Sequence, residues 1–495
     1  MSIARKALVG VLWSSGSNYI SQAIGVLAQA VLGRLILAQE YGLFATANSI
    51  IQFVFILSAF SFNISVIQSV EERDRLYSTA FVLNIALCVV SLVMTGVAVI
   101  GYSLFRALTA TEVTVIFALA VANILNLLGQ HFDAILQRNL EFRKISVIAL
   151  LMNTVNPLLA VALAFSGAGV WSMVAGQIAA GVVFLGGSSI MAGWKVSVSF
   201  SRETAAWFLR LGWRYLGSRS LEVVYTELDR IVIKRMNSYE QVGIYDRANL
   251  AARYPSRVVN PAINSVALPL YAKVKTESRM LSEAYALVNF FLLRILLPLA
   301  LVFLLVPDLF MQAVFGGRWL PAGPVLRVLA LYAVLYPVSE NLKVLFYALG
   351  EPGVVAKIRF IQIVVYVPCL VALVSLHGIV GAAWALVVGI TAMTVAFLLR
   401  TRRTVSFQPM KTVGVPLLFA ALTAVVFLLV PRPHIGHPIP ALLFAAMEIF
   451  LIFCIWEMIF ERKIVREKFR FVRDTLKRKE PVGDRPLRGS AEEGR

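Results

Sequence analysis

About fourteen apolar segments, each of roughly twenty residues, follow one another along almost the whole chain. A helix of about that length crosses the hydrocarbon part of a bilayer, because each residue adds about 1.5 Å along the helix axis. We therefore predict an all-α polytopic membrane protein with about fourteen transmembrane helices. The predicted spans lie near residues 8–33, 43–66, 77–105, 113–136, 145–165, 170–192, 213–234, 245–270, 283–306, 324–349, 354–376, 379–400, 412–430 and 439–460.

The composition excludes an ordinary soluble protein. Of the 495 residues, 59% are hydrophobic and only 15% are charged, and the mean hydropathy is +0.79. The three cysteines, Cys88, Cys369 and Cys454, stand singly in apolar segments without the spacing of a metal site. We expect them to pack as small apolar residues, with no disulfide and no metal.

The basic residues are placed in alternate connections between the predicted spans, so the net charge of +19 indicates topology rather than a nucleic-acid partner. By the positive-inside rule these connections face the cytoplasm, as do both termini. The basic segment after residue 460 either lies on the anionic inner leaflet as an interfacial helix or is a solvated tail. The basic clusters lie at residues 5–6, 73–75, 138–144, 195–202, 273–279, 357–359 and 400–403 and in the C-terminal tail.

Part of the sequence recurs after about 201 positions. Gly42-Leu43-Phe44 returns as Gly243-Ile244-Tyr245, and Ala47-Asn48 returns as Ala248-Asn249. An even number of helices in each half gives both halves the same orientation, so the repeat is parallel. We predict a six-helix lobe at 1–204, a second at 205–404, two further transmembrane helices at 405–460 and a basic cytoplasmic tail at 461–495, with a central cavity between the lobes.

Charged residues in the second half lie in segments that otherwise suit a bilayer, where charge is costly without a partner or a water-filled cavity. On a helix, five polar residues spaced by four, four, three and four positions share one face. With Arg219 they predict a cationic cavity wall. The five are Asn249, Arg253, Arg257, Asn260 and Asn264.

The first half offers amides at the matching positions: Asn18 and Gln22 in the first span, Asn48 and Gln52 in the second. Amides hydrogen-bond sugar hydroxyls, whereas arginines form forked, charge-assisted contacts to phosphate. A cavity with both walls would suit a glycan attached to a phosphate or pyrophosphate. The structural alternative is that the amides join neighbouring helices by hydrogen bonds.

Acidic residues in the same region give a hypothesis of ion coupling, in which Glu222 or Asp229 carries a proton or a sodium ion. The structural alternative pairs Glu222 with Arg219, and Asp229 with Arg253 or Arg257. The sequence contains none of the common catalytic or nucleotide-binding motifs and no Cys/His ligand set. We therefore predict no enzyme activity and no cofactor.

Three stretches resemble the polysaccharide transporter family: residues 10–50, LQRNLEFRKIS at 136–146, and LDRIVIKRMNSYEQVGIYDRANLAARYP at 228–255. This is the Wzx-like flippase branch of the multidrug/oligosaccharidyl-lipid/polysaccharide exporter superfamily, of the colanic acid, teichuronic acid and succinoglycan exporter type. The resemblance extends to about residue 400.

The resemblance implies a bacterial inner-membrane protein that flips an undecaprenyl-pyrophosphate-linked oligosaccharide to the periplasmic leaflet by alternating access of two six-helix lobes. It also suggests membrane lipids, and polymerase and chain-length proteins of the same pathway, as partners. Related lipid II flippases carry cavity arginines in their N-terminal lobe, a pattern that this sequence lacks in its first two spans.

Two other functions stay open from the sequence. A cation-coupled drug antiporter of the same superfamily would need a desolvated acid, for which Glu222, Glu227 and Asp229 are candidates. A membrane-embedded polysaccharide polymerase or ligase usually has a large periplasmic loop, and the connections here are too short to fold as a separate domain.

Overall fold

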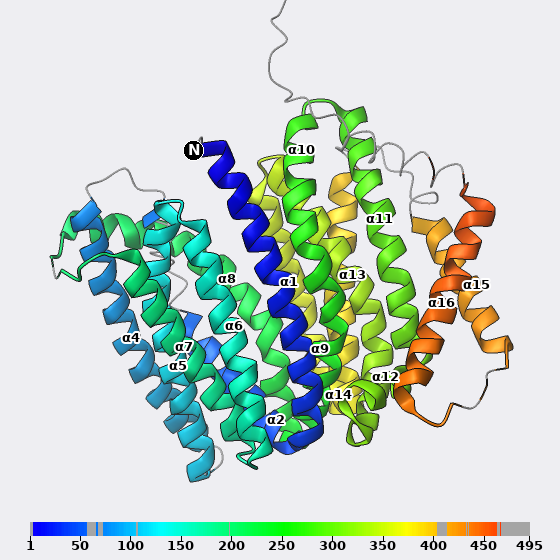
Figure 1. The fold of residues 1–495 in the computed structure, drawn as a ribbon, viewed down its shortest axis with the longest axis horizontal. Helices are drawn as coiled ribbons and strands as arrows, with labels where there is room; N and C mark the ends of the chain where they lie inside the picture. Colours follow the sequence, from blue (N-terminus) through cyan, green and yellow to red (C-terminus); the bar gives the residue numbers. More distant parts are fainter. Residues whose placement is uncertain are drawn as a thin grey trace, which may run out of the picture.

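The computed structural model describes residues 3–56, 66–67, 73–104, 107–197, 199–402, 413–431, 433, 435–462 and 466. These residues form helices joined by short turns, and no strand occurs among them (Figure 1). The predicted all-α class is therefore confirmed. The helices are α1 (Ile3–Leu35), α2 (Ala38–Val54), α4 (Arg73–Ser103), α5 (Ala110–Arg138), α6 (Phe142–Phe165), α7 (Val170–Ala192), α8 (Arg202–Met236), α9 (Tyr239–Ala262), η2 (Ile263–Ala267), α10 (Leu268–Val274), α11 (Ser278–Leu305), α12 (Pro307–Phe315), η3 (Gly317–Ala322), α13 (Gly323–Ala348), α14 (Pro352–Thr401), α15 (Val415–Leu429) and α16 (Pro438–Phe460).

The chain is a multi-pass membrane protein. Eight helices of the described part, among them α5, α6, α7, α11 and α16, are long and apolar enough to cross a bilayer. Helix α14 contains two of the predicted spans, and Gly378 breaks it between them with φ 57° and ψ −135°. Part of the second predicted span, residues 57–65, lies outside the described residues, and the count of fourteen stays a prediction.

The helices form two groups side by side (Figure 1). In the first group α6 packs on α1 and α7, and α5 packs on α4 and α7. In the second group α13 packs on α9, α11 and α14, and α14 also packs on α8. The arrangement agrees with the predicted plan of two lobes, while the boundaries at residues 204, 404 and 460 stay predictions.

Different helices lie at the two ends of the molecule, which we call the α2 end and the α10 end. The α2 end, lower in Figure 1, holds the turn between α1 and α2 together with α12 and η3; the α10 end, above, holds the N-terminus. Helices α8 and α9 meet near the α2 end, and each begins with a serine cap. The side-chain oxygens of Ser201 and Ser238 each accept a hydrogen bond from the backbone N–H three residues later, at 3.3 Å.

Helices α2 and α9, which contain the repeated sequence, cross in direct backbone contact between the groups. A Cβ atom on Gly42 would lie 1.6 Å from the carbonyl oxygen of Tyr239. A Cβ atom on Gly243 would lie 1.9 Å from the carbonyl oxygen of Ala38. Each residue of this crossing corresponds to its partner in the internal repeat, so the two helices contact each other through equivalent surfaces.

Helices α15 and α16 pack against α11 at the edge of the second group (Figure 1). Their contact is apolar, and Arg294 of α11 adds ion pairs to Glu457, at 2.6 Å, and to Glu461. Of the basic tail, residues 463–465 and 467–495 lie outside the described residues, and so does the interfacial helix considered there.

Candidate functional site

A cavity of about 430 Å³ lies between the two helix groups. Helices α1, α2, α6 and α7 line it on one side and α9 on the other. This volume falls in the range of pockets that bind small molecules or parts of larger ones. The lining residues are Ser21, Gln22, Gly25, Val26, Gln29, Leu32, Tyr41, Phe44, Asn153, Asn156, Pro157, Ala160, Met173, Gln177, Arg247, Leu250, Tyr254 and Arg257.

The two walls of the cavity differ in chemistry. The first helix group contributes five amide side chains, and α9 contributes two guanidinium groups and a tyrosine. Amides donate and accept hydrogen bonds as sugar hydroxyls require, and guanidinium groups bind anionic oxygens. The five amides are Gln22, Gln29, Asn153, Asn156 and Gln177.

Arg257 is the exposed cation of the cavity. Its guanidinium carbon lies 5.5 Å from the centre of the Tyr254 ring, and the residue is exposed. Among the described carboxylates, none forms an ion pair with it, so its charge is available to a ligand. An arginine in this state can bind a phosphate oxygen without first losing a partner.

Arg247 lines the same cavity, and both of its terminal nitrogens are hydrogen-bonded, while its buried Nε has no partner among the described residues. Its Nη1 donates to Gln29 Oε1 across the cavity at 2.6 Å, and its Nη2 donates to Asp246 Oδ2 at 2.9 Å. Its guanidinium carbon lies 3.9 Å from the centre of the Tyr41 ring. Arg247 therefore joins the two helix groups at the cavity.

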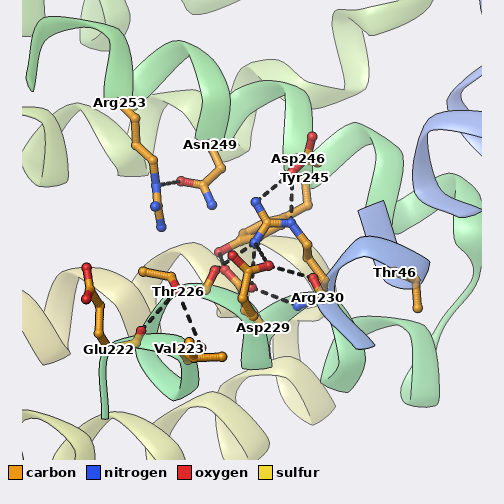
Figure 2. A network of polar contacts seen from close by, with 12 residues as sticks. Thr46, Glu222, Val223, Thr226, Asp229, Arg230, Tyr245, Asp246, Asn249 and Arg253 are labelled. Carbon is orange, nitrogen blue, oxygen red and sulfur yellow. Dashed lines mark hydrogen bonds and ion pairs between the residues drawn. The ribbon is translucent and has the colours of Figure 1, made fainter. Parts of the chain in front are cut away.

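Asn249 and Arg253 do not line this cavity. Their side chains point toward α8, which carries Thr226 and Asp229 (Figure 2). Arg253 Nε donates to Asn249 Oδ1 at 2.9 Å, and its guanidinium carbon lies 5.8 Å from the centre of the Tyr332 ring on α13. The buried Nη2 of Arg253 and Nδ2 of Asn249 have no protein partner within the described structure. The face predicted from the spacing is thus divided: Arg257 reaches the cavity, and these two residues do not line it.

The remaining predicted residues are distributed over several places. Gln22 lines the cavity, whereas Asn48 and Gln52 on α2 are half-buried outside its lining. Asn260 is half-buried, and its Oδ1 is buried without a described partner. The side chains of Asn18 and Asn264 lie outside the described residues.

Asp229 belongs to a buried ionic network in the second group (Figure 2). Its Oδ2 accepts a hydrogen bond from Tyr245 Oη at 2.7 Å, and its Oδ1 lies 3.4 Å from Arg230 Nη1. Arg230 also pairs with Asp246 at 2.8 Å and with Glu227 at 3.3 Å. The proposed pairing of Asp229 with Arg253 or Arg257 is therefore wrong, because the adjacent Arg230 takes that place.

Glu222 and Arg219 pair with each other at 3.0 Å, as the structural alternative predicted. Their side chains are 45% and 47% exposed, and neither lines the cavity. An exposed pair of this kind contributes at most about 1 kcal/mol to stability. Whether they take part in binding or coupling stays a prediction.

Four residues that line the cavity were not predicted from the sequence: Asn153, Asn156, Gln177 and Arg247. On α9 the cavity face runs through Arg247, Leu250, Tyr254 and Arg257, at spacings of three, four and three. That spacing places the four residues on one face of a helix, and its basic and aromatic residues could have indicated a cavity wall. The three amides of α6 and α7 are isolated in apolar segments, and only their neighbours in space reveal them.

The sequence is similar to those of several known proteins. Residues 31–324 match the model of the family described as polysaccharide biosynthesis protein. The chain belongs to this family. It is 28% identical to the teichuronic acid biosynthesis protein TuaB of Bacillus subtilis, over 68% of this chain and 69% of that one. It is 26% identical to the lipopolysaccharide biosynthesis protein WzxC of Escherichia coli, over 77% and 78% of the two chains. It is also 26% identical to the succinoglycan biosynthesis transport protein ExoT of Rhizobium meliloti, over 68% of each chain.

Two solved structures share the fold of this family member. The lipid II flippase MurJ in an inward closed conformation superposes with a TM-score of 0.69 at 15% identity, covering 92% of this chain and all of that one. An inward-facing multidrug resistance MATE transporter gives a TM-score of 0.62 at 17% identity, covering 78% and 94%. At 15% and 17% identity these likenesses show a shared fold, and they agree with the predicted all-α architecture.

Proposed function

We propose that this protein is a flippase that moves a lipid-linked oligosaccharide across a bacterial inner membrane, for exopolysaccharide or lipopolysaccharide biosynthesis. The substrate is an oligosaccharide repeat unit on undecaprenyl pyrophosphate. The glycan and its phosphate groups enter the cavity, while the polyprenyl chain stays in the bilayer. The names of the relatives, which refer to the biosynthesis of teichuronic acid, lipopolysaccharide and succinoglycan, support this class of substrate.

The observation that carries the proposal is the contrast between the cavity walls. Five amides of the first group face a guanidinium, that of Arg257, which has no carboxylate partner among the described residues. A neutral glycan would need only the amides, and a simple anion would need only the arginine. A glycan joined to a pyrophosphate needs both.

The distribution of basic residues supports an orientation. The α10 end carries the connections rich in Lys and Arg, such as 138–144 and 273–279, so we place it in the cytoplasm with both termini. The α2 end then faces the periplasm. Transport would proceed by movement of the two helix groups, with predicted boundaries at 204 and 404, around the cavity between them.

Other partners follow from the pathway rather than from the cavity. Membrane lipids surround the molecule, whose outer helices expose many leucine and valine side chains. Polymerase and chain-length proteins of the same pathway are proposed partners, and nucleic acid is not. No catalytic role is proposed.

The proposal also includes energy coupling, in which Glu222 or Asp229 would carry a proton or a sodium ion. Both carboxylates already have partners, Arg219 for the first and Tyr245 with Arg230 for the second. A coupling ion at Asp229 would therefore have to compete with an internal guanidinium. The same occupancy weighs against a drug antiporter, which requires an acid that is free to bind a cation.

The deciding experiment measures the leaflet distribution of undecaprenyl-linked oligosaccharide in cells that lack the gene. We expect accumulation on the cytoplasmic side, reversed by the wild-type gene. A normal distribution together with lost efflux of a cationic dye would instead establish the antiporter.

Complementation with Arg257→Ala tests the cavity directly. Charge-assisted hydrogen bonds are worth about 1.5–3 kcal/mol, so we expect flipping to fall about tenfold or more with normal amounts of protein in the membrane. The matched control is Arg279→Ala, which removes a 92% exposed arginine paired with Glu283 and should leave flipping unchanged. Undiminished flipping by Arg257→Ala would remove this residue from the site.

A further inference from the structure

The segment Pro307–Ala322, which comprises α12 and η3 and is called here the latch segment, links the two helix groups at the α2 end. It belongs in sequence to the second group, yet it packs on the end of α1 in the first. Trp319 is fully buried there. A Cβ atom on Gly33 of α1 would lie only 3.0 Å from Cδ1 of Phe315.

Among the described residues, three hydrogen bonds join the latch segment to the end of α1 and to Ile36, which follows it. Trp319 Nε1 donates to the carbonyl oxygen of Gly33 at 2.6 Å, and Arg318 Nη1 donates to that of Ile36 at 3.2 Å. In the opposite direction, Arg34 Nη2 donates to the carbonyl oxygen of Ala313 at 2.8 Å. The last carbonyl groups of a helix lack partners within it, so side chains of the second group complete the end of α1.

Tyr41 connects this contact to the cavity. One side of its buried ring meets the Trp319 ring edge-on, with centroids 5.6 Å apart and an angle of 74°. The Arg247 guanidinium carbon lies 3.9 Å from the centre of the same ring. Arg247 in turn holds Gln29 across the cavity. A continuous series of contacts therefore runs from the cavity wall to the α2 end.

We propose that Trp319 and Arg247 are positioning residues of one latch that keeps the α2 end shut until an anion enters the cavity. This inference rests on the proposed function. A phosphate group offers Arg247 a stronger, forked contact than the neutral amide of Gln29. When Arg247 turns to the phosphate, it leaves Gln29 and the ring of Tyr41. The contact between the two helix groups is then weaker, and the latch segment separates from α1.

The test uses the full-length chain in lipid nanodiscs, with Cys88, Cys369 and Cys454 replaced by alanine. Spin labels at Leu37 and Met236 report on the α2 end, one in each helix group, and both positions are exposed. A second pair at Leu140 and Lys275 reports on the α10 end. Distance distributions are measured for each pair by electron paramagnetic resonance.

Trp319→Ala should lengthen the distance at the α2 end and shorten that at the α10 end, because the groups then move as units. Trp319→Phe keeps an aromatic ring but loses the indole N–H and its bond to Gly33, and should shift both distances in the same directions by less. Trp384→Ala, at a 43% exposed tryptophan of α14, is the matched control and should change neither distance. A change confined to the distance at the α2 end would show that Trp319 contributes only local packing, and it would contradict the proposed latch.

The link to the cavity is tested with inorganic pyrophosphate as the probe. Wild-type protein should shift toward the open α2 end as pyrophosphate is added. Arg247→Gln and Gln29→Ala should begin with that end more open, and Arg247→Gln should show no further shift. Pyrophosphate that binds in an Arg257-dependent way but moves neither distance would disprove the link and leave the proposed function standing. Absence of binding would count against the proposed function, while the Trp319 variants would still decide the latch.

Discussion

Arginines on one helix can have unrelated roles when a single turn changes their surroundings. Arg253 is held by Asn249 inside the second helix group, whereas Arg257 faces the cavity without a carboxylate partner among the described residues. Arg247, six residues before Arg253, is held between Asp246 and Gln29. At the residue scale, the neighbours of each guanidinium decide its role, and the residue type does not.

Asp229 gives a test of the same distinction. Asp229→Asn removes a buried carboxylate that accepts a hydrogen bond from Tyr245 and pairs with Arg230. We therefore expect the free energy of unfolding to fall by about 2 kcal/mol. Glu222→Gln, at a 45% exposed carboxylate, should change stability by less than about 1 kcal/mol. Thermal unfolding of the purified protein measures both.

Transport by the same variants separates stability from coupling. If Asp229→Asn destabilises the protein but keeps the dependence of flipping on the proton or sodium gradient, Asp229 is structural. Loss of that dependence in a stably folded variant would establish it as the coupling group.

At the scale of elements, the crossing of α2 and α9 determines how closely the two groups approach. The glycines at 42 and 243 let each backbone touch the other, and any side chain there would overlap a carbonyl oxygen. The polar contacts beside the crossing, such as Ser49 Oγ donating to Glu227 Oε2 at 2.8 Å, depend on this approach. The repeat thus places matching glycines where the halves meet.

Gly42→Ala and Gly243→Ala should each separate α2 from α9 and hinder closure of the α2 end. We expect flipping to fall severalfold and the distance between labels at Leu37 and Met236 to increase. Gly96→Ala on α4, where an added Cβ would meet nothing within 4 Å, is the matched control. Normal flipping and unchanged distances in both variants would show that the crossing tolerates a wider spacing.

At the scale of the whole molecule, α15 and α16 form an addition that is fixed to the second group by one face. Apolar side chains of α11, α15 and α16 make most of the contact, and Arg294 holds Glu457 and Glu461 of the α16 region. The ionic contact is largely removed from solvent, since the side chains are 10% to 14% exposed. Removing one member of such a group leaves the charge of the others buried without a partner.

Arg294→Met should therefore weaken the packing of α16 and lower the stability of the protein by about 3–5 kcal/mol. This loss should exceed that caused by removing all three charges together. The triple variant Arg294→Met, Glu457→Gln and Glu461→Gln should recover much of the loss. The rate of Cys454 modification by an apolar maleimide, on a residue half-buried in α16, reports the loosening. Equal rates in the wild type and Arg294→Met would show that the apolar contact alone holds these helices.

The features of the fold that could be predicted from the sequence are those whose sequence patterns extend over many residues. The long apolar segments predicted helices that the structure confirms from α4 to α16, because a bilayer requires the backbone of each segment to satisfy its own hydrogen bonds. The internal repeat indicated two related halves, and the glycines that carried it form the crossing of α2 and α9.

The site was predictable only in its chemistry. Amides from the first half and arginine from the second were expected to face each other, and Gln22 and Arg257 do so. Tertiary structure decided which polar residues line the cavity: it turned Arg253 inward, brought in Arg247 and added the amides of α6 and α7. It also carried the latch segment onto α1. A sequence records the polarity of each helix face, but which face meets which neighbour depends on how helices pack over hundreds of residues, and that packing has no local signal.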